Sequence, residues 1–187
     1  MNWFNPLFRD VHGDCLNCVG ITNDSMSFQR INSKFEFEIP VGSHVGSFGY
    51  PRRHDVHKGV DLYCPVGTDI APVEAGKVVD IRPFTGPILG HTWWHNTWAI
   101  SVEGETGVVV YGEIEVNPTL KIGDVVDEGY LLGSVLQVLT VDKGRPMAML
   151  HIALHRHGVL RNGVWEVGTP QPSGLIDPTN HLIRGLL

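Results

Sequence analysis

The stretch Met149-Leu150-His151-Ile152-Ala153-Leu154-His155 alternates between two kinds of side chain along its whole length. Successive side chains of a β-strand point to opposite faces of a sheet, so the three residues Leu150, Ile152 and Leu154 share an apolar face. His151 and His155 lie on the other face, together with Met149 and Ala153. The alternation predicts a strand packed on a core, with its second face turned to a site or to water. Taken alone, the simpler interpretation is that the histidines face water.

Short runs of similar β character continue outward from this stretch. They lie at 68–73, 76–81, 98–102, 107–111, 125–126 and 131–136, and turn signals separate them. The 187 residues include 22 glycines and 12 prolines, which suits short strands joined by tight turns better than helix bundles. The sequence predicts a mostly β fold with little helix, an antiparallel sheet of sandwich-like or barrel-like form.

The chain reads as one domain with extensions. Residues 1–39 are predicted to form an N-terminal extension that packs on the domain and ends in a half-buried strand at 35–39. The domain would occupy 40–187, with its core at 40–155 and a C-terminal extension at 156–187. Residues 83–95 are predicted to form a long loop, and a short helical turn is expected after Asp177-Pro178.

Charge and hydropathy exclude some classes of partner. The chain has 14 Lys and Arg against 20 Asp and Glu, a net charge of -6, so it lacks the basic field that would bind nucleic acid. No apolar run reaches the length of a membrane span, and no signal peptide is visible at the N-terminus. We therefore expect a soluble protein, cytoplasmic or released without a signal peptide. Its oligomeric state is left open.

The three cysteines form no obvious disulfide framework. Cys15-x-x-Cys18 is either half of a metal site or redox pair, or two free thiols of the extension. Cys64 is expected to pack beneath the site and is not assigned as a ligand.

The ten histidines are more informative, because histidine is the commonest side-chain metal ligand. The stretch His57-Lys58-Gly59-Val60-Asp61 places a histidine and a carboxylate four residues apart, where both can occupy corners of a tetrahedral zinc site. His151 could supply a third ligand. The competing interpretation is a solvated surface pair.

Several motifs, in this order, carry a resemblance to a known family. They are Ser47-Phe48-Gly49-Tyr50, His57-x-Gly59-Val60-Asp61-Leu62, 67–78, 98–111, 120–133 and the strand of His151. Together they resemble the lysostaphin-type zinc metallopeptidases, the peptidoglycan or glycyl-glycine endopeptidase family. The resemblance covers roughly residues 40–155.

The resemblance implies a fold, a cofactor and a substrate class. The implied fold is the mostly β lysostaphin type, related to a barrel-sandwich hybrid. One Zn²⁺ would be bound by His57, Asp61 and His151, leaving the fourth position for water or substrate. The family acts on glycine-containing peptide cross-links of bacterial cell walls, and it is usually extracytoplasmic.

Two residues depart from the family pattern. In Tyr111-Gly112-Glu113-Ile114, Glu113 replaces a histidine, and Met149 replaces a second histidine two residues before His151. A glutamate can act as a general base beside zinc, so Glu113 is the candidate catalytic base. Methionine cannot transfer a proton, and losing one such group typically costs about 10²- to 10⁴-fold in rate.

Other side chains are candidates for the substrate groove. His91, Trp94 and His95 belong to the predicted loop and would line the groove together with Met149 and His155. The competing interpretation is that these are ordinary loop histidines beside packing aromatics.

The resemblance thus implies a zinc metalloendopeptidase, a hydrolase of cell-wall-type peptides, here with reduced or altered catalysis because of the two replacements. The alternative is a catalytically inactive homologue, a pseudoenzyme that uses the zinc site and groove to bind a peptide, glycan or protein. A structural module without metal is a third possibility. Whether residues 1–35 cover the groove is left open.

Overall fold

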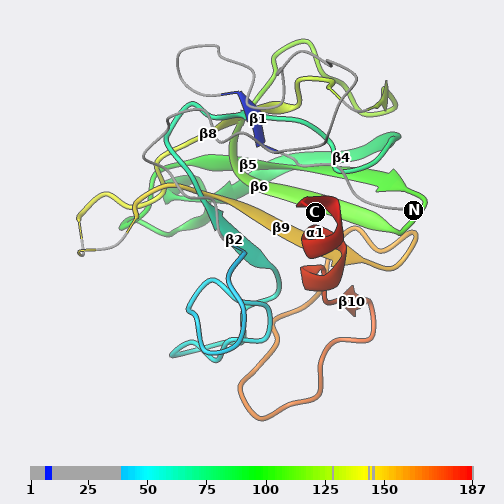
Figure 1. The fold of residues 1–187 in the computed structure, drawn as a ribbon. Helices are drawn as coiled ribbons and strands as arrows, with labels where there is room; N and C mark the ends of the chain where they lie inside the picture. Colours follow the sequence, from blue (N-terminus) through cyan, green and yellow to red (C-terminus); the bar gives the residue numbers. More distant parts are fainter. Residues whose placement is uncertain (1–6, 10–38, 128, 143, 145, 187) are drawn as a thin grey trace, which may run out of the picture.

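A computed structural model gives the structure of residues 7–9, 39–127, 129–142, 144 and 146–186 (Figure 1). Its main feature is a ten-stranded sheet in which the paired strands run antiparallel. The strands are β1 (Leu7–Arg9), β2 (Val60–Tyr63), β3 (Asp69–Ile70), β4 (Gly76–Thr85), β5 (Thr97–Gly104), β6 (Val108–Val116), β7 (Val125–Val126), β8 (Gly133–Val135), β9 (Met149–His155) and β10 (Leu175–Ile176). The prediction of a mostly β, antiparallel fold is confirmed.

The sheet is organised around β6. One path through it runs β1-β3-β8-β6-β5-β4-β7, and β9 joins this path by pairing with β6. Strands β2 and β10 pair in turn with β9, so β9 lies between β6 and β2 in the region of the candidate site. Figure 1 shows β9 crossing behind β2 and running towards helix α1 (Thr179–Leu186).

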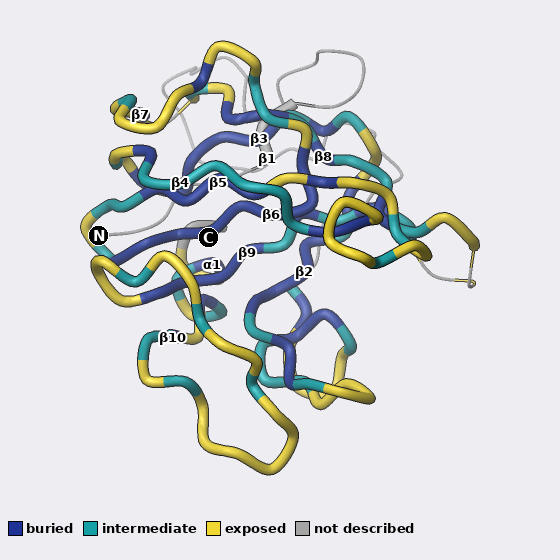
Figure 2. Tube along the Cα trace, turned by 180° about the vertical axis from the view of Figure 1, so that it is seen from behind, coloured by how far each residue is buried: buried dark blue, intermediate teal, exposed yellow. Residues whose placement is uncertain are grey.

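One face of the sheet packs on the main core. Leu150, Ile152 and Leu154 of β9 are buried in this core with Tyr111 of β6. The phenol oxygen of Tyr111 accepts a hydrogen bond from the backbone N–H of Val73 at 2.8 Å, so this buried polar group is satisfied. Figure 2 shows the resulting band of buried residues along β5, β6 and β9.

The opposite face of β9 lines a groove. Met149, His151, Ala153 and His155 all contribute to its lining, which confirms the predicted alternation of this strand. A small second cluster contains Ala99, Val110 and Ala153, with Phe84 packed against it, and all of these except Ala99 line the groove.

Two local predictions were wrong. Residues 83–85 continue β4 and are not loop, because Pro83 pairs with Trp98 of β5 beside a bulge. On the other side of β4, strand β7 pairs only with Gly76 and Lys77, so it does not reach Pro83. A proline is tolerated at such a bulge, where its missing N–H leaves no ladder bond unmade. The connection after Thr85 then contains a short 3-10 helix, Pro87–Leu89.

The expected C-terminal turn is a longer helix, α1, of eight residues. Asp177 accepts a hydrogen bond from the backbone N–H of Thr179 at 2.9 Å near the helix start. Leu182 is buried in the main core, and this contact explains why the helix extends beyond one turn.

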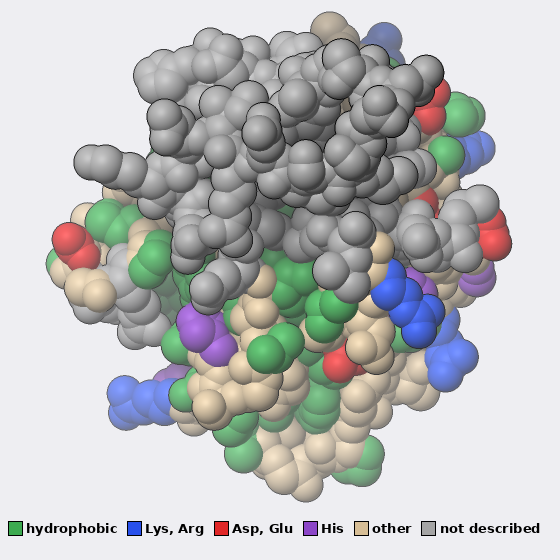
Figure 3. Space-filling view, viewed as in Figure 1, with side chains coloured by type: hydrophobic (Ala, Val, Ile, Leu, Met, Phe, Trp, Pro, Cys, Tyr) green, Lys and Arg blue, Asp and Glu red, His purple; other side chains and the backbone are tan. Residues whose placement is uncertain are grey.

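Several expectations concern other parts of the chain. The strand predicted at 35–39 and Cys15-x-x-Cys18 lie outside the described residues, except for Ile39, which packs against the core without forming strand. Cys64 is buried in the core, as expected. Within the described part of the chain, no helix has the length and apolar character needed to cross a membrane. On the face drawn in Figure 3, Lys and Arg side chains lie towards the sides of the molecule.

Candidate metal centre

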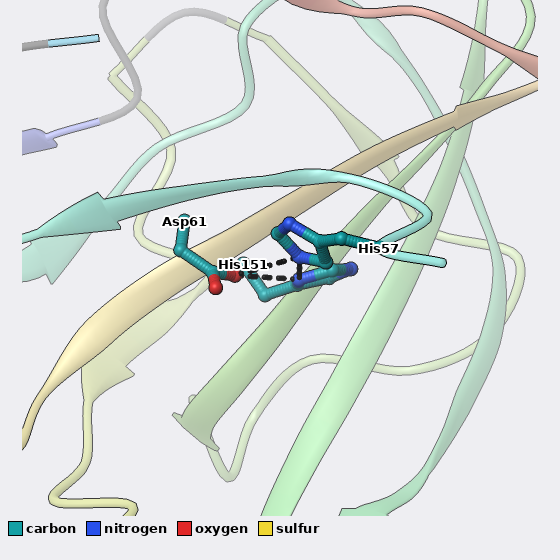
Figure 4. A group of neighbouring side chains, drawn as sticks. All are labelled: His57, Asp61 and His151. Carbon is teal, nitrogen blue, oxygen red and sulfur yellow. Dashed lines mark hydrogen bonds and ion pairs between the residues drawn. The ribbon is translucent and has the colours of Figure 1, made fainter. Parts of the chain in front are cut away.

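Strands β2 and β9 bring together the three residues predicted to bind zinc. Asp61 on β2 and His151 on β9 are register partners across the antiparallel ladder. His57 lies in the segment just before β2, and its side chain turns back towards them (Figure 4). These three residues form a candidate metal site whose ligand atoms all lie within 4.8 Å of one another.

The distances between these atoms suit a zinc ion. Asp61 Oδ1 lies 3.1 Å from His57 Nε2 and 2.9 Å from His151 Nδ1, and the two nitrogens are 3.2 Å apart (Figure 4). Tetrahedral zinc with nitrogen and oxygen ligands at about 2.0–2.1 Å requires ligand atoms about 3.3–3.4 Å apart. The three atoms therefore need to move only a few tenths of an ångström to hold the ion.

The chemistry of the donor atoms also fits a cation. His57 Nδ1 lies 2.9 Å from the backbone carbonyl of Ser47. Since a carbonyl only accepts, Nδ1 carries the proton and donates it, which leaves the lone pair on Nε2 facing Asp61. Two acceptors, Nε2 and Oδ1, then face each other at 3.1 Å, and a cation between them relieves the repulsion.

The surroundings hold the residues in their metal-binding protonation states. Burial tends to raise the pKa of Asp61, but its close contacts with His151 and His57 outweigh burial and keep the pKa well below the usual range. Arg52 donates to Asp61 Oδ2 at 2.9 Å. Burial lowers the pKa of His151. A neutral imidazole and an ionised carboxylate are the forms that bind a metal.

Gly59 makes room for the centre. A Cβ atom at this position would lie 2.7 Å from the His151 ring and would also collide with the backbone carbonyl of Ile152. The glycine between His57 and Asp61 therefore allows β2 to approach β9 closely.

Glu113 has an unusual backbone conformation. Its φ is 66°, a value that non-glycine residues seldom adopt. Trp98 pairs with Ile114 and Ala99 pairs with Gly112, so Glu113 is the extra residue of a β-bulge in β6. Bulges redirect side chains, and here the bulge places Glu113 in the lining of the groove that holds the metal centre.

Two threonines hold the Glu113 carboxyl group. Thr97 and Thr85 approach its Oε2 at 2.7 and 2.9 Å, and their hydroxyl oxygens are 2.7 Å apart. Three oxygens in mutual contact need three protons, of which the hydroxyls supply two and a protonated Glu113 would supply the third. Burial raises the pKa of Glu113 to about 7, although the hydrogen bonds from Thr97 and Thr85 oppose the shift.

Most of the predicted groove residues line one cavity of about 980 Å³. It contains the three candidate ligands and Glu113, together with His91, Trp94, Met149 and His155. His95 is exposed and does not contribute to this lining; its backbone carbonyl accepts from the Thr85 hydroxyl at 3.3 Å. His155 is buried, and its Nδ1 donates to the carbonyl of Val159 at 3.0 Å.

Sequence reasoning missed Thr85 and Thr97. Neither belongs to a motif, and they meet Glu113 only through the pairing of β4, β5 and β6. It also missed Ser47 as the partner of His57, because this contact uses a backbone carbonyl that any residue could supply.

Comparison with solved structures identifies the fold. The catalytic domain of the antimicrobial peptidase lysostaphin from Staphylococcus simulans matches with a TM-score of 0.50 and 18% identity, covering 79% of this chain and 92% of that chain. Csd3 from Helicobacter pylori has a TM-score of 0.43 and 19% identity, covering 72% of this chain and 37% of that one. No protein-family model matches the sequence, and no curated protein does. The match to the lysostaphin catalytic domain shows that this chain has a lysostaphin-type fold.

Proposed function

We propose that this protein binds one zinc ion through His57, Asp61 and His151 and hydrolyses amide bonds in glycine-containing peptides of the cell-wall type. The observation that carries the proposal is the convergence of three ligand atoms, 2.9–3.2 Å apart, in a groove of about 980 Å³. The likeness of the fold to the catalytic domain of an antimicrobial peptidase supports the reaction class.

The residues present divide the work of amide hydrolysis. Zinc bound at this centre would supply a Lewis acid that polarises the amide carbonyl and makes water more acidic. Glu113 is the general base, which takes a proton from the attacking water and delivers it to the leaving amine. A pKa of about 7 suits both steps, because the carboxyl group can then gain and lose a proton near neutral pH.

Glu113 is held in place by its neighbours. The hydroxyls of Thr85 and Thr97 fix Oε2, and the bulge in β6 aims the side chain into the groove. The left-handed backbone of Glu113 costs of order 1 kcal/mol, and conformations of this kind concentrate at functional sites.

A specific observation favours the second candidate function, a catalytically inactive homologue that binds a peptide, glycan or protein in the same groove. Met149 lines the groove two residues before His151, at the position where the family resemblance calls for a proton-transfer histidine. Both candidates require zinc, and they differ only in turnover.

Zinc content and hydrolysis of a pentaglycine peptide test the proposal together. We expect about one equivalent of zinc in protein purified without chelator, cleavage that stops when zinc is removed, and loss of both on His57→Ala. The conservative variant Glu113→Gln should keep the zinc and lose the cleavage. Zinc without any cleavage of pentaglycine or peptidoglycan would instead support the inactive homologue.

A further inference from the structure

The groove differs in charge from the rest of the chain. Although the net charge is -6, more cationic than acidic side chains line the groove. The cationic residues are Arg52, Arg53, Lys58, Arg82 and Arg161, and the acidic ones are Asp55, Asp61 and Glu113. Asp61 belongs to the metal centre, which leaves Asp55 and Glu113 against the five cations. The groove therefore carries surplus positive charge, which attracts an anionic ligand.

Three of these cations come from separate segments and form what we call the cationic arm: Lys58, Arg82 and Arg161. Arg82 Nη1 lies 2.7 Å from Asp80 Oδ2, and Arg161 Nη2 lies 3.8 Å from the same oxygen. Lys58 donates to the backbone carbonyl of Gly163 at 3.0 Å, which ties the loop after β9 to the segment before β2.

The arm has too little negative charge of its own. Its two guanidinium groups share the single carboxylate of Asp80, and the Lys58 ammonium is bound by carbonyls. Two charged side chains act on the Lys58 ammonium, Asp55 as an acidic group and Arg82 as a second cation. Cations that share one carboxylate gain from a ligand that brings another.

The register of the sheet gives the backbone separation between the metal centre and Arg82, the member of the arm on β4. Arg82 pairs with Ala99, Ala99 pairs with Gly112, and Gly112 pairs with His151. Arg82 and His151 are thus three strand spacings apart, about 14 Å between backbones. An extended peptide covers this distance with roughly four residues.

We infer that the cationic arm binds a carboxylate of the peptide substrate, so that this protein selects peptides with a carboxylate roughly four residues from the scissile amide. The inference rests on the proposed function for the position of the peptide across the metal centre. The carboxylate can belong to an acidic side chain or to a free C-terminus.

Three matched peptides test the inference by binding alone. Each begins with an acetylated run of four glycines and differs only in its last residue, which is a glutamate amide, a glutamine amide or a glutamine with a free C-terminal carboxylate. Each is titrated calorimetrically against the protein with zinc present and with zinc removed. We expect at least one of the two carboxylate peptides to bind about tenfold more tightly than the neutral one. The more tightly bound one identifies the source of the carboxylate.

Variants assign the preference to the arm. Arg161 is 70% exposed, so Arg161→Gln should fold normally and reduce the preference about threefold. In the double variant Lys58→Gln/Arg161→Gln, the affinities for the carboxylate peptide and the neutral peptide should differ by less than about twofold. The control Lys77→Gln/Lys121→Gln changes the net charge equally at two exposed residues that do not line the groove, and it should keep the full preference.

Equal affinity for all three peptides would overturn the inference, and so would a preference that survives in the Lys58→Gln/Arg161→Gln variant. A charge preference in a protein that hydrolyses none of the peptides would leave the inference standing and count against the proposed function alone.

Discussion

Asp61 and His151 are register partners on the antiparallel strands β2 and β9, and Asp61 Oδ1 lies 2.9 Å from His151 Nδ1. The sheet ladder itself therefore sets the separation of two of the three candidate ligands. His57, whose ring is oriented by the carbonyl of Ser47, completes the group. A centre built in this way depends on the close approach of β2 to β9.

Gly59→Ala should disrupt that approach. The added methyl group would collide with the carbonyl of Ile152 and the ring of His151, so we expect a loss of stability of about 2–4 kcal/mol and weaker zinc binding. Denaturant unfolding with and without zinc measures both effects. Gly163→Ala is the matched control, because a Cβ there meets no atom within 4 Å. Equal stability of the two variants would show that Gly59 is not needed for close packing.

Asp61→Asn should weaken zinc binding more than about 100-fold, since changes beside a metal ligand already cost 10- to 100-fold. Competition with a chromophoric chelator measures the dissociation constant. Asp55→Asn removes another groove carboxylate that is not a candidate ligand, and it should leave the constant nearly unchanged. Comparable losses in both variants would point to general electrostatics in the groove.

Glu113 should make the stability of the zinc-free protein depend on pH. Its pKa in the folded state is about 7, above its ordinary value of 4.5, so the folded protein holds this proton more tightly than the unfolded chain. This proton contributes about 3 kcal/mol to the free energy of unfolding. The contribution is fully present below pH 4.5 and is lost as the pH rises through about 7.

The variant Glu113→Gln has no such proton. Its free energy of unfolding relative to the original protein should therefore rise between about pH 5 and pH 8, as measured by denaturant titration in the presence of a chelator. A constant difference between the two proteins across this range would show that the carboxyl group titrates normally.

Met149→His should raise peptidase activity. The side chain lies in the groove two residues before His151, and a histidine there could transfer protons. We expect an increase of at least about tenfold in kcat/KM for pentaglycine. Met149→Gln fills similar space without transferring protons, and it should give no increase. An equal gain with glutamine would assign the effect to polarity.

The sequence was sufficient to predict β9, because its alternation separates core residues from groove residues. Motif order also led to His57, Asp61 and His151 as a group. By contrast, Pro83 led to a wrong loop prediction, since the effect of a proline depends on whether its strand has a partner on that side.

The surroundings of Glu113 could not be predicted in the same way. Its bulge exists only in the register of β5 against β6, and its partners Thr85 and Thr97 lie 28 and 16 residues earlier in the chain. The cationic arm has the same origin, since it joins Lys58, Arg82 and Arg161 from three distant segments. Contacts that depend on strand pairing leave little trace in the local sequence.

X-ray absorption at the zinc edge of the purified protein tests the central claim most directly. The account predicts about one equivalent of zinc with nitrogen and oxygen ligands at about 2.0–2.1 Å, including two imidazoles, and loss of an imidazole signal on His151→Ala. Protein without zinc, or zinc with sulfur ligands at about 2.3 Å, would contradict it.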